Sequence, residues 1–302
     1  MNKIIFLCNW GENSSDLKKK YNKLTKCSNY KWKNLEIVDN INEAEWFVLM
    51  DNTYDHYLNL NKKRVIGIQR EPYINFNIKN FNNYLSYNNY IHLVVRLIDS
   101  NMNYEKINNL NTNLKKKHCS AVVSKLIKKS PSEAYKSYKL RINFIKMISR
   151  IDCFDIDIFG YNWEKGELGK NYKGALGGFN NNNSNNNENI IPNSNKLDGL
   201  LDYKYSIAIE NCKKNNYISE KFTDCILAGT IPIYYGADNI GDYFPKDSYY
   251  TIDIKSNKCL VDLKNILNKP VTEKNKKALK NAKDLILNKY NMLESIHKII
   301  NS

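Results

Sequence analysis

One continuous stretch, residues 205–236, constrains the fold more than any other part of the chain: "YSIAIENCKKNNYISEKFTDCILAGTIPIYYG". Its first five residues form an apolar run typical of a buried strand, and a polar turn follows. An amphipathic helical pattern comes next, with Phe222, Cys225 and Ile226 on one side and an expected end at Gly229. A second apolar run closes the stretch. The pattern therefore predicts a strand, a helix and another strand, as in α/β proteins.

The rest of the chain repeats this alternation. Strand patterns cover residues 3–8, 44–50, 64–69, 118–124 and 154–160, and helical patterns cover 14–24 and 130–150. In the second helix, Ser130 suits the cap and Pro131 suits the first helical position. Because 302 residues are many for one hydrophobic core, we predict two α/β domains. They cover 1–112 and 113–278, and an amphipathic helix covers 279–302.

The formal charge of +15 and the pI near 9.3 raise the question of nucleic-acid binding. The excess is mostly Lys, and it accompanies an Asn surplus that a coding sequence rich in A and T would also produce. No stripe of Arg and aromatic residues and no zinc-finger spacing accompanies the charge, so a nucleic-acid surface is the less favoured interpretation. The Gly- and Asn-rich segment 174–195 predicts a surface loop rather than a binding element.

Several features bear on the cellular compartment. The seven cysteines are scattered and form no C-x-x-C pair, so we expect reduced thiols. The first 16 residues suit a β-strand better than a signal peptide. No segment approaches the roughly 20 apolar residues needed to cross a bilayer. We therefore expect a soluble, cytoplasmic protein.

Glu220 and Lys221 stand side by side at the entrance of the helix within 205–236. A helix entrance after the carboxyl edge of a sheet presents free N–H groups and the positive end of the helix dipole, so Lys221 there predicts a diphosphate-binding corner. Glu220 would repel the diphosphate unless it accepts hydrogen bonds from neutral hydroxyls, such as those of a ribose. In the alternative interpretation, Glu220 only complements the helix dipole and Lys221 is solvated.

The same stretch resembles the C-terminal signature of the α-1,3-fucosyltransferases, glycosyltransferase family 10. That signature contains Phe-Glu-Asn, a spacer, Tyr-hydrophobic-Thr-Glu-Lys and a Pro-containing strand that ends in Gly. The corresponding residues are Glu210, Asn211, Tyr217, Ile218, Ser219, Glu220, Lys221, Pro232 and Gly236. The chain departs from the signature at Ile209, where Phe is usual, and at Ser219, where Thr is usual. Residues 118–160 continue the resemblance less fully.

This resemblance implies an α/β fold of the GT-B type, in which two Rossmann-like domains face a cleft. It also implies inverting transfer of L-fucose from GDP-β-L-fucose to a hydroxyl of a glycan acceptor. The donor would be bound by Glu220, Lys221, Asn211 and Tyr217, although Tyr217 could instead be an ordinary core residue. Arg141 falls where the family has its diphosphate-binding arginine, whereas helical spacing alone would make it a solvated or structural residue.

Glu71, in the segment "REPYINF", resembles the Glu-Pro element that carries the family's proposed general base. An inverting displacement needs a base that removes the proton of the acceptor hydroxyl as the new bond forms. The nearby segment "LSYNNYIHLVVRL" lacks the family's usual Arg-Asp-Ser-Asp and Pro-Tyr-Gly pattern. A capping carboxylate is therefore the alternative role for Glu71.

Asp155 and Asp157 have the Asp-x-Asp spacing by which many other glycosyltransferases hold a divalent metal. In a strand, however, residues two apart share one face, and "FDIDIFG" alternates as a half-buried strand does. We prefer a structural or solvent-facing pair. The four histidines show no ligand spacing. We expect neither a metal nor another cofactor, because Lys221 and Arg141 would neutralise the leaving diphosphate.

The C-terminal segment has helical periodicity and many lysines. Its apolar positions include Leu279, Ala282, Leu285, Leu287 and Ile296. A basic amphipathic helix could make peripheral contact with an anionic membrane, but packing across the two domains is the preferred interpretation. Two functional alternatives stay open beside fucosyl transfer: the same fold with another nucleotide-sugar donor, and a basic binding protein without catalysis.

Overall fold

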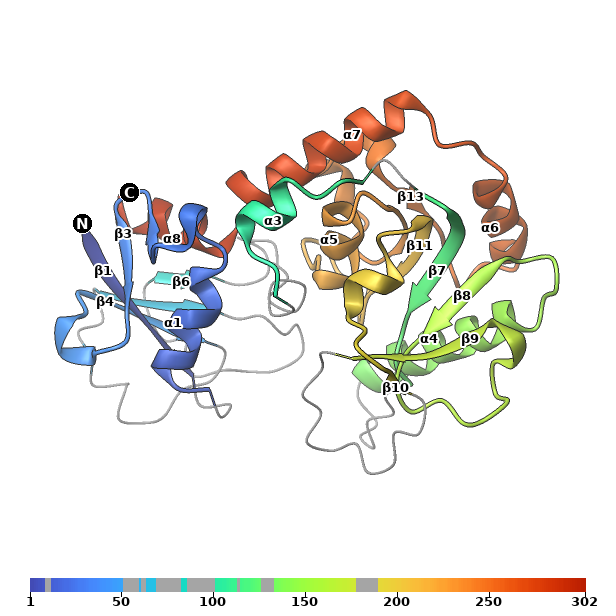
Figure 1. Ribbon diagram of the computed structural model, residues 1–302, viewed down its shortest axis with the longest axis horizontal. Helices are drawn as coiled ribbons and strands as arrows, with labels where there is room; N and C mark the ends of the chain where they lie inside the picture. The colour runs from blue at the N-terminus through green and yellow to red at the C-terminus, as the bar shows by residue number, and fades with distance from the viewer. Residues whose placement is uncertain are drawn as a thin grey trace. The chain divides into compact units, whose positions relative to one another are not determined.

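The computed structural model describes residues 1–8, 12–50, 60, 64–68, 83–85, 101–112, 115–125, 133–177 and 190–302. The chain divides into two compact units (Figure 1). The first contains residues 1–109 and 284–302, and the second contains 110–283. Each unit has its own parallel or mostly parallel sheet, which confirms the predicted α/β class.

The first unit contains a six-stranded sheet in the order β2-β3-β1-β4-β5-β6. Its strands are β1 (Asn2–Cys8), β2 (Lys31–Trp32), β3 (Leu35–Val38), β4 (Trp46–Met50), β5 (Val65–Ile68) and β6 (Asn83–Leu85). Of these six described strands, only β2 pairs antiparallel with its neighbour. The centre of β1 is fully buried, as expected for a parallel strand covered on both faces. Helix α1 (Ser14–Asn22) packs Tyr21 on Phe6, with ring centroids 4.2 Å apart.

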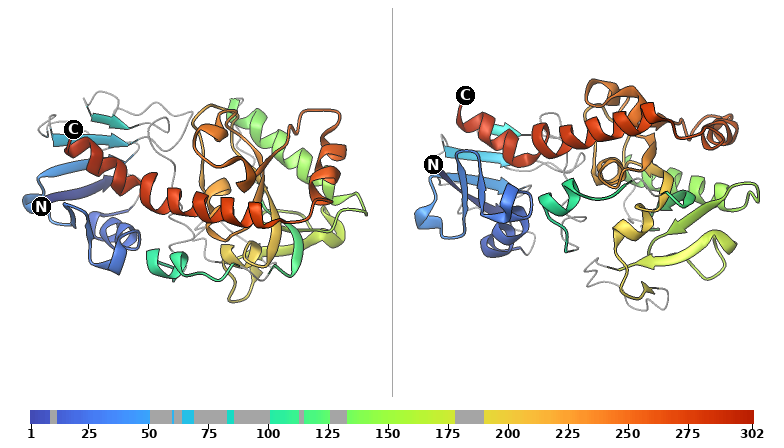
Figure 2. Two further views of the ribbon diagram at one scale, coloured as in Figure 1. Left: turned by 90° about the horizontal axis from the view of Figure 1, so that it is seen from above. Right: turned by 45° about the horizontal axis from the view of Figure 1, so that its top comes forward.

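The second unit contains a seven-stranded parallel sheet in the order β10-β9-β8-β7-β11-β12-β13 (Figures 1 and 2). Its strands are β7 (Lys117–Val122), β8 (Ile156–Phe159), β9 (Tyr172–Leu176), β10 (Ile190–Ile191), β11 (Tyr203–Ile209), β12 (Ile231–Tyr235) and β13 (Tyr250–Thr251). The chain builds outward from β7 in one direction and from β11 in the other. In open parallel sheets, ligands bind at such a reversal, outside the carboxyl ends of the strands.

The helices of this unit include α4 (Glu133–Ser149), α5 (Glu220–Leu227) and α6 (Cys259–Leu267). Helix α5 connects β11 to β12, as the sequence predicts. Its buried residues include Phe222, Cys225 and Ile226, and the Phe222 ring lies 5.0 Å from that of Tyr234 and 4.9 Å from that of Phe244. This aromatic packing fixes the side of α5 that faces the sheet.

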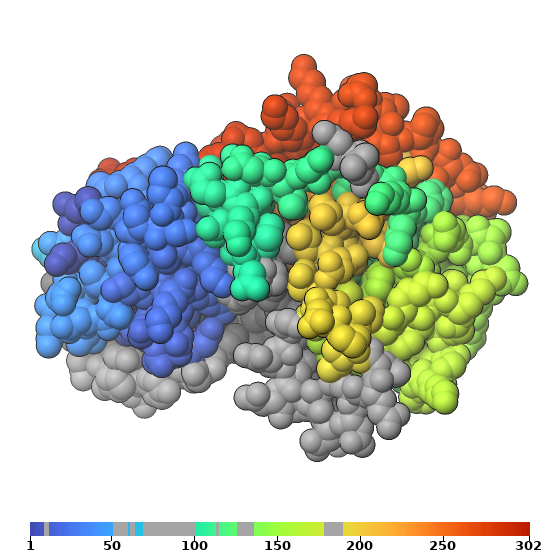
Figure 3. All heavy atoms as spheres, viewed as in Figure 1, coloured from blue at the N-terminus to red at the C-terminus, as the bar shows by residue number. Residues whose placement is uncertain are grey.

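The carboxyl end of α5 is closed by backbone and side-chain hydrogen bonds. Gly229 has φ +66°, and the N–H groups of Gly229 and Thr230 donate to carbonyl oxygens of the last helical turn. The Lys115 ammonium donates to the carbonyl oxygens of Leu201 and Ala228, each at 2.7 Å. Figure 3 shows the green residues near 115 beside the yellow residues near 200. Burial lowers the pKa of Lys115 to about 8.

Replacing Gly229 by Ala is expected to lower the free energy of unfolding by about 3 kcal/mol, because it adds a steric clash to backbone strain. A Cβ there would lie 2.4 Å from Cβ of Thr112. Gly166 is a matched control, since it also has positive φ but nothing lies within 4 Å of its virtual Cβ. Gly166→Ala should cost only about 1 kcal/mol. Urea unfolding measures both, and equal losses would contradict the role of the clash.

The C-terminal segment differs from one continuous helix over 279–302. Helix α7 (Glu273–Asp284) is followed by a π-helical segment (Leu285–Lys289) and by α8 (Met292–Ile300). The break occurs because the Asn291 side chain accepts from the Glu294 N–H and starts a new helix. Glu294 in turn accepts from the Trp32 indole N–H at 3.0 Å, so α8 packs within the first unit.

The domain boundaries after residues 112 and 278 stay predictions. The two compact units of the structure divide close to these positions, after residues 109 and 283. Within the described part of the chain, no helix combines the length and apolar character required to cross a membrane. Among the described residues, which include all seven cysteines, no disulfide is formed.

Candidate functional site

The carboxyl end of β11 meets the amino end of α5 through a network of hydrogen bonds. Glu210 follows β11 directly, and Ser219 is the N-cap of α5. The Glu210 carboxylate accepts hydrogen bonds from the backbone N–H of Ser219, at 2.7 Å, and from its hydroxyl. The Ser219 oxygen also accepts from the backbone N–H of Lys221. The first turn of α5 is therefore fixed to the end of the strand.

Glu220 and Lys221 lie next to each other at this helix entrance, as the sequence predicts. The Lys221 ammonium is 3.0 Å from Glu220 Oε1, 3.2 Å from Ser219 Oγ and 3.8 Å from Glu210 Oε2. Both side chains are only 19% exposed. The ammonium is thus held by acceptors in the wall of the site and is not freely solvated.

Arg141 comes from α4 and is almost fully buried, at 4% exposure. Its Nη1 donates to Asn211 Oδ1 at 2.7 Å, and its guanidinium lies 4.9 Å from the centroid of the Tyr138 ring. Its Nε is buried without a hydrogen-bond partner among the described residues. Burial lowers the pKa of Arg141, while the nearby charges of Glu220 and Glu210 act in the opposite direction. The structure therefore brings Arg141 and Asn211 together at the carboxyl edge.

Glu210 also belongs to this site, although the sequence marks it only as part of the family motif. It is 1% exposed, and burial raises the pKa of its carboxyl group while Lys221 opposes the shift. A Cβ at Gly236 would lie 2.6 Å from Cγ of Glu210 and 2.2 Å from the hydroxyl of Tyr234, so only glycine fits there. The feature of the sequence that could have identified Glu210 is its position directly after an apolar strand.

Of the remaining residues that the sequence predicts, the structure describes Tyr217 but not Glu71. Tyr217 is 3% exposed, and its backbone oxygen accepts from the hydroxyl of Tyr234 at 3.3 Å. It therefore lies in the same turn, with little surface left for a ligand. Glu71 lies outside the described residues, as do Ser130 and Pro131.

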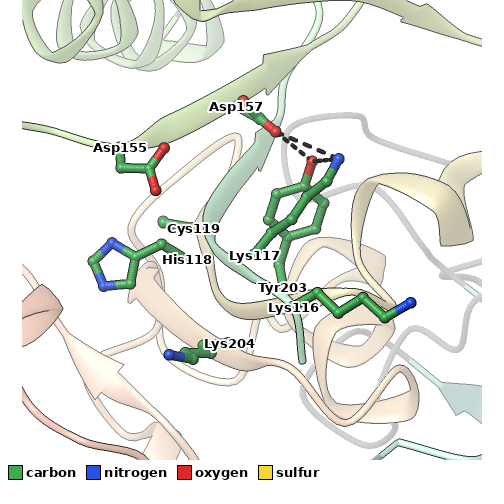
Figure 4. Close-up of a pocket in the computed structure, with 8 residues that line it drawn as sticks. All are labelled: Lys116, Lys117, His118, Cys119, Asp155, Asp157, Tyr203 and Lys204. Carbon is green, nitrogen blue, oxygen red and sulfur yellow. Dashed lines mark hydrogen bonds and ion pairs between the residues drawn. The ribbon is translucent and has the colours of Figure 1, made fainter. Parts of the chain in front are cut away.

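A hollow of about 400 Å³ occurs at the amino ends of the strands of the same sheet, opposite their carboxyl ends (Figure 4). Its lining comes from the starts of β7, β8 and β11, and consists of Lys116, Lys117, His118, Cys119, Asp155, Asp157, Tyr203 and Lys204. Asp157 accepts from the Tyr203 hydroxyl at 2.7 Å and lies 3.7 Å from the Lys117 ammonium. Since α5 begins after the carboxyl end of β11, we do not place a nucleotide-sugar donor in this hollow. Among the described residues, no group of three or more His, Cys, Asp or Glu is arranged to hold a metal ion.

Comparison with known proteins assigns the chain to a family. Residues 112–279 match the model of "Glycosyltransferase family 10 (fucosyltransferase) C-term". The chain is 40% identical over 70 residues to α-(1,3)-fucosyltransferase B of Drosophila melanogaster, a match that covers 22% of this chain and 16% of that protein. It is 37% identical over 60 residues to GDP-fucose protein O-fucosyltransferase 3 of Canis lupus familiaris, covering 18% and 13%. The matches thus span less than a fifth of either relative.

A crystal structure of an α1,3-fucosyltransferase with GDP-fucose has a similar fold over nearly the whole chain. The TM-score is 0.50 at 17% sequence identity, and the alignment covers 99% of this chain and 88% of the other. At this identity the likeness concerns the fold alone. It confirms the predicted α/β fold of the GT-B type.

Proposed function

Because the chain belongs to glycosyltransferase family 10, the fucosyltransferases, we propose that it transfers L-fucose from GDP-β-L-fucose to a hydroxyl of a glycan acceptor, with inversion at the anomeric carbon. One observation carries the proposal. Arg141 and Lys221 lie at the carboxyl edge with the amino end of α5, and Nε of Arg141 is a buried donor that has no partner among the described residues. A donor diphosphate would supply the missing acceptor.

The donor side of the mechanism uses charges that this chain already holds in place. As the bond between fucose and diphosphate breaks, negative charge accumulates on the leaving GDP. Arg141, Lys221 and the positive end of the α5 dipole meet this charge without a metal ion. Glu220 accepts from the ribose hydroxyls, and the amide nitrogen of Asn211 donates a further hydrogen bond. Tyr217, which is 3% exposed, contacts the donor through the little surface that it leaves accessible.

The acceptor side requires a base. The acceptor oxygen attacks the anomeric carbon on the face opposite the diphosphate, while Glu71 takes the hydroxyl proton. One bond between carbon and oxygen forms as the other breaks. The products are an α-fucoside, GDP and the protonated carboxyl group of Glu71.

A second candidate concerns the acceptor and the donor rather than the reaction. One of the similar proteins is named as a protein O-fucosyltransferase, so a protein hydroxyl is the alternative acceptor. The residues of the proposed donor site would recognise diphosphate and ribose, which UDP-sugars share with GDP-fucose. A non-catalytic basic binding protein is the third candidate, favoured only by the net charge.

Isothermal titration calorimetry in buffer containing EDTA tests the donor. We expect GDP-fucose to bind, and Lys221→Ala to weaken its binding about 20-fold, the cost of a hydrogen bond to a charged group. Lys204→Ala is the matched control, because Lys204 is exposed at the opposite edge of the sheet. It should leave the affinity within about twofold of the wild type.

Other outcomes would change the assignment. Binding of a UDP-sugar in place of GDP-fucose would overturn the donor and keep the enzyme class. A requirement for divalent metal would overturn the metal-free mechanism, and a β-fucoside in the ¹H NMR spectrum of the product would overturn inversion. If no nucleotide sugar binds, and DNA or RNA binding survives Lys221→Ala and Arg141→Ala, the protein is a basic binding module.

A further inference from the structure

Glu210 is a buried carboxylate for which the proposed mechanism has no use. Its side chain is fully buried at the end of β11, where Oε1 accepts from the Ser219 N–H and Oε2 from the Ser219 hydroxyl. Burying a charged group is unfavourable unless other groups compensate it. The compensating groups here are Ser219, Lys221 and the positive end of α5.

The hydrogen bonds of Ser219 have a fixed direction as a result. Because its hydroxyl proton is donated to Glu210, the oxygen lone pairs face Lys221, whose backbone N–H lies at 3.3 Å and whose ammonium lies at 3.2 Å. The ammonium also donates to Glu220 at 3.0 Å. Two of its three N–H groups thus have acceptors among the described residues, and the third is available to a ligand as far as these residues extend.

The neighbouring residue holds the second cation in a similar way. Asn211 accepts from Nη1 of Arg141, so consecutive residues at the end of one strand contact the two cations of the site. The position of Glu210 is itself restricted, since a side chain at Gly236 would overlap it. A single strand end therefore sets the positions of both cations.

We infer that Glu210 is a positioning residue for the donor diphosphate: it holds Ser219, and through Ser219 the first turn of α5 and the ammonium of Lys221, in the orientation that meets the phosphates. This inference deepens the proposed function and rests on it. Glu210 itself does not contact the donor, because its side chain is fully buried. Its negative charge would repel a diphosphate, so the inference requires that positioning outweighs repulsion.

A double-mutant cycle read out by GDP affinity separates positioning from general structural support. The four proteins are the wild type, Glu210→Gln, Lys221→Met and the double variant. Gln keeps the shape of Glu and loses the charge that orients Lys221. We expect Glu210→Gln to weaken GDP binding about tenfold when Lys221 is present and less than about twofold when it is Met. Equal losses in the two backgrounds, or tighter binding by Glu210→Gln, would overturn the inference.

Variants of Ser219 keep the test decisive if Glu210→Gln lowers stability. Ser219→Thr retains the hydroxyl and should bind GDP within about twofold of the wild type, whereas Ser219→Ala should lose about tenfold. Equal affinities for the two variants would overturn the inference. UDP and ADP are titrated as well: wild-type protein that binds UDP but not GDP overturns the proposed donor, and the cycle is then measured with UDP. If none of the three nucleotides binds, the inference falls with the diphosphate site.

Discussion

Replacing Arg141 by Met is expected to lower kcat/KM about a thousandfold without lowering the stability of the protein. The loss follows from the position of the guanidinium, which offers buried donors where charge would develop on the leaving diphosphate. Nη1 is held by Asn211 at 2.7 Å, and Nε has no partner among the described residues. Arg141→Lys should recover little activity, because an ammonium cannot replace the planar fork.

The stability half of this prediction follows from the burial of an incompletely paired cation. Removing a charge from water is unfavourable, and an apolar residue of similar length often restores or raises stability at such a position. Asn211, the partner left behind, is only partly buried, so water can satisfy its carboxamide. The free energy of unfolding should therefore stay the same or rise by about 1 kcal/mol.

Urea unfolding with and without GDP, together with steady-state kinetics, tests both halves. GDP should stabilise the wild type and leave Arg141→Met unchanged. Arg150→Met is the control, since Arg150 is exposed just beyond the end of α4. It should keep its activity and its response to GDP. A several-kcal/mol loss of stability in Arg141→Met with activity retained would make Arg141 a structural residue.

The parts of the fold that could be predicted are those with a strong local pattern. The stretch from β11 through α5 to β12 combines two apolar runs with an amphipathic helix and Gly229, and each feature depends on neighbouring residues only. β13 has two residues and β2 also has two, too few to show any periodicity. Such short strands form because a sheet edge is available, which no local pattern reveals.

The division of the C-terminal segment illustrates a conflict between two local signals. The apolar periodicity continues through Leu285 and Leu287, which predicts one helix. Asn291 breaks it, because its side chain caps a new helix and Glu294 then reaches Trp32. That contact joins residues 262 positions apart, so the benefit of the break is invisible along the sequence.

The candidate site could be predicted in part for the same reason. Glu220 and Lys221 are adjacent residues at a helix start that the sequence predicts. Their position side by side at the entrance of α5 therefore follows from local residues alone. The contact of Arg141 with Asn211 spans 70 positions, and only a family resemblance pointed to that arginine. Glu210 reaches Ser219 because the intervening turn closes on itself, with Asn216 at φ +66° and bonded to Asn239. A turn of this geometry has no simple sequence signature.

Replacing Glu71 by Gln is expected to lower kcat about a thousandfold, the range found for the loss of a general base. Gln has nearly the same shape and can still hydrogen-bond the acceptor hydroxyl, but it cannot take up the proton. In the proposed mechanism the donor is bound by groups of the second unit, so the Kd for GDP-fucose should stay within about twofold. Kinetics of GDP release in the presence of acceptor, and calorimetry with the donor, measure the two quantities separately.

This pairing of results distinguishes Glu71 from every residue of the donor site. Arg141→Met and Lys221→Ala should weaken donor binding together with turnover, because the proposed mechanism places their ligands on the leaving group. Glu71→Gln should affect turnover alone, since the proton it takes belongs to the acceptor. Glu43→Gln is the control, an exposed carboxylate of the first unit that should leave both quantities unchanged. If Glu71→Gln keeps kcat within about threefold, a group other than Glu71 is the base.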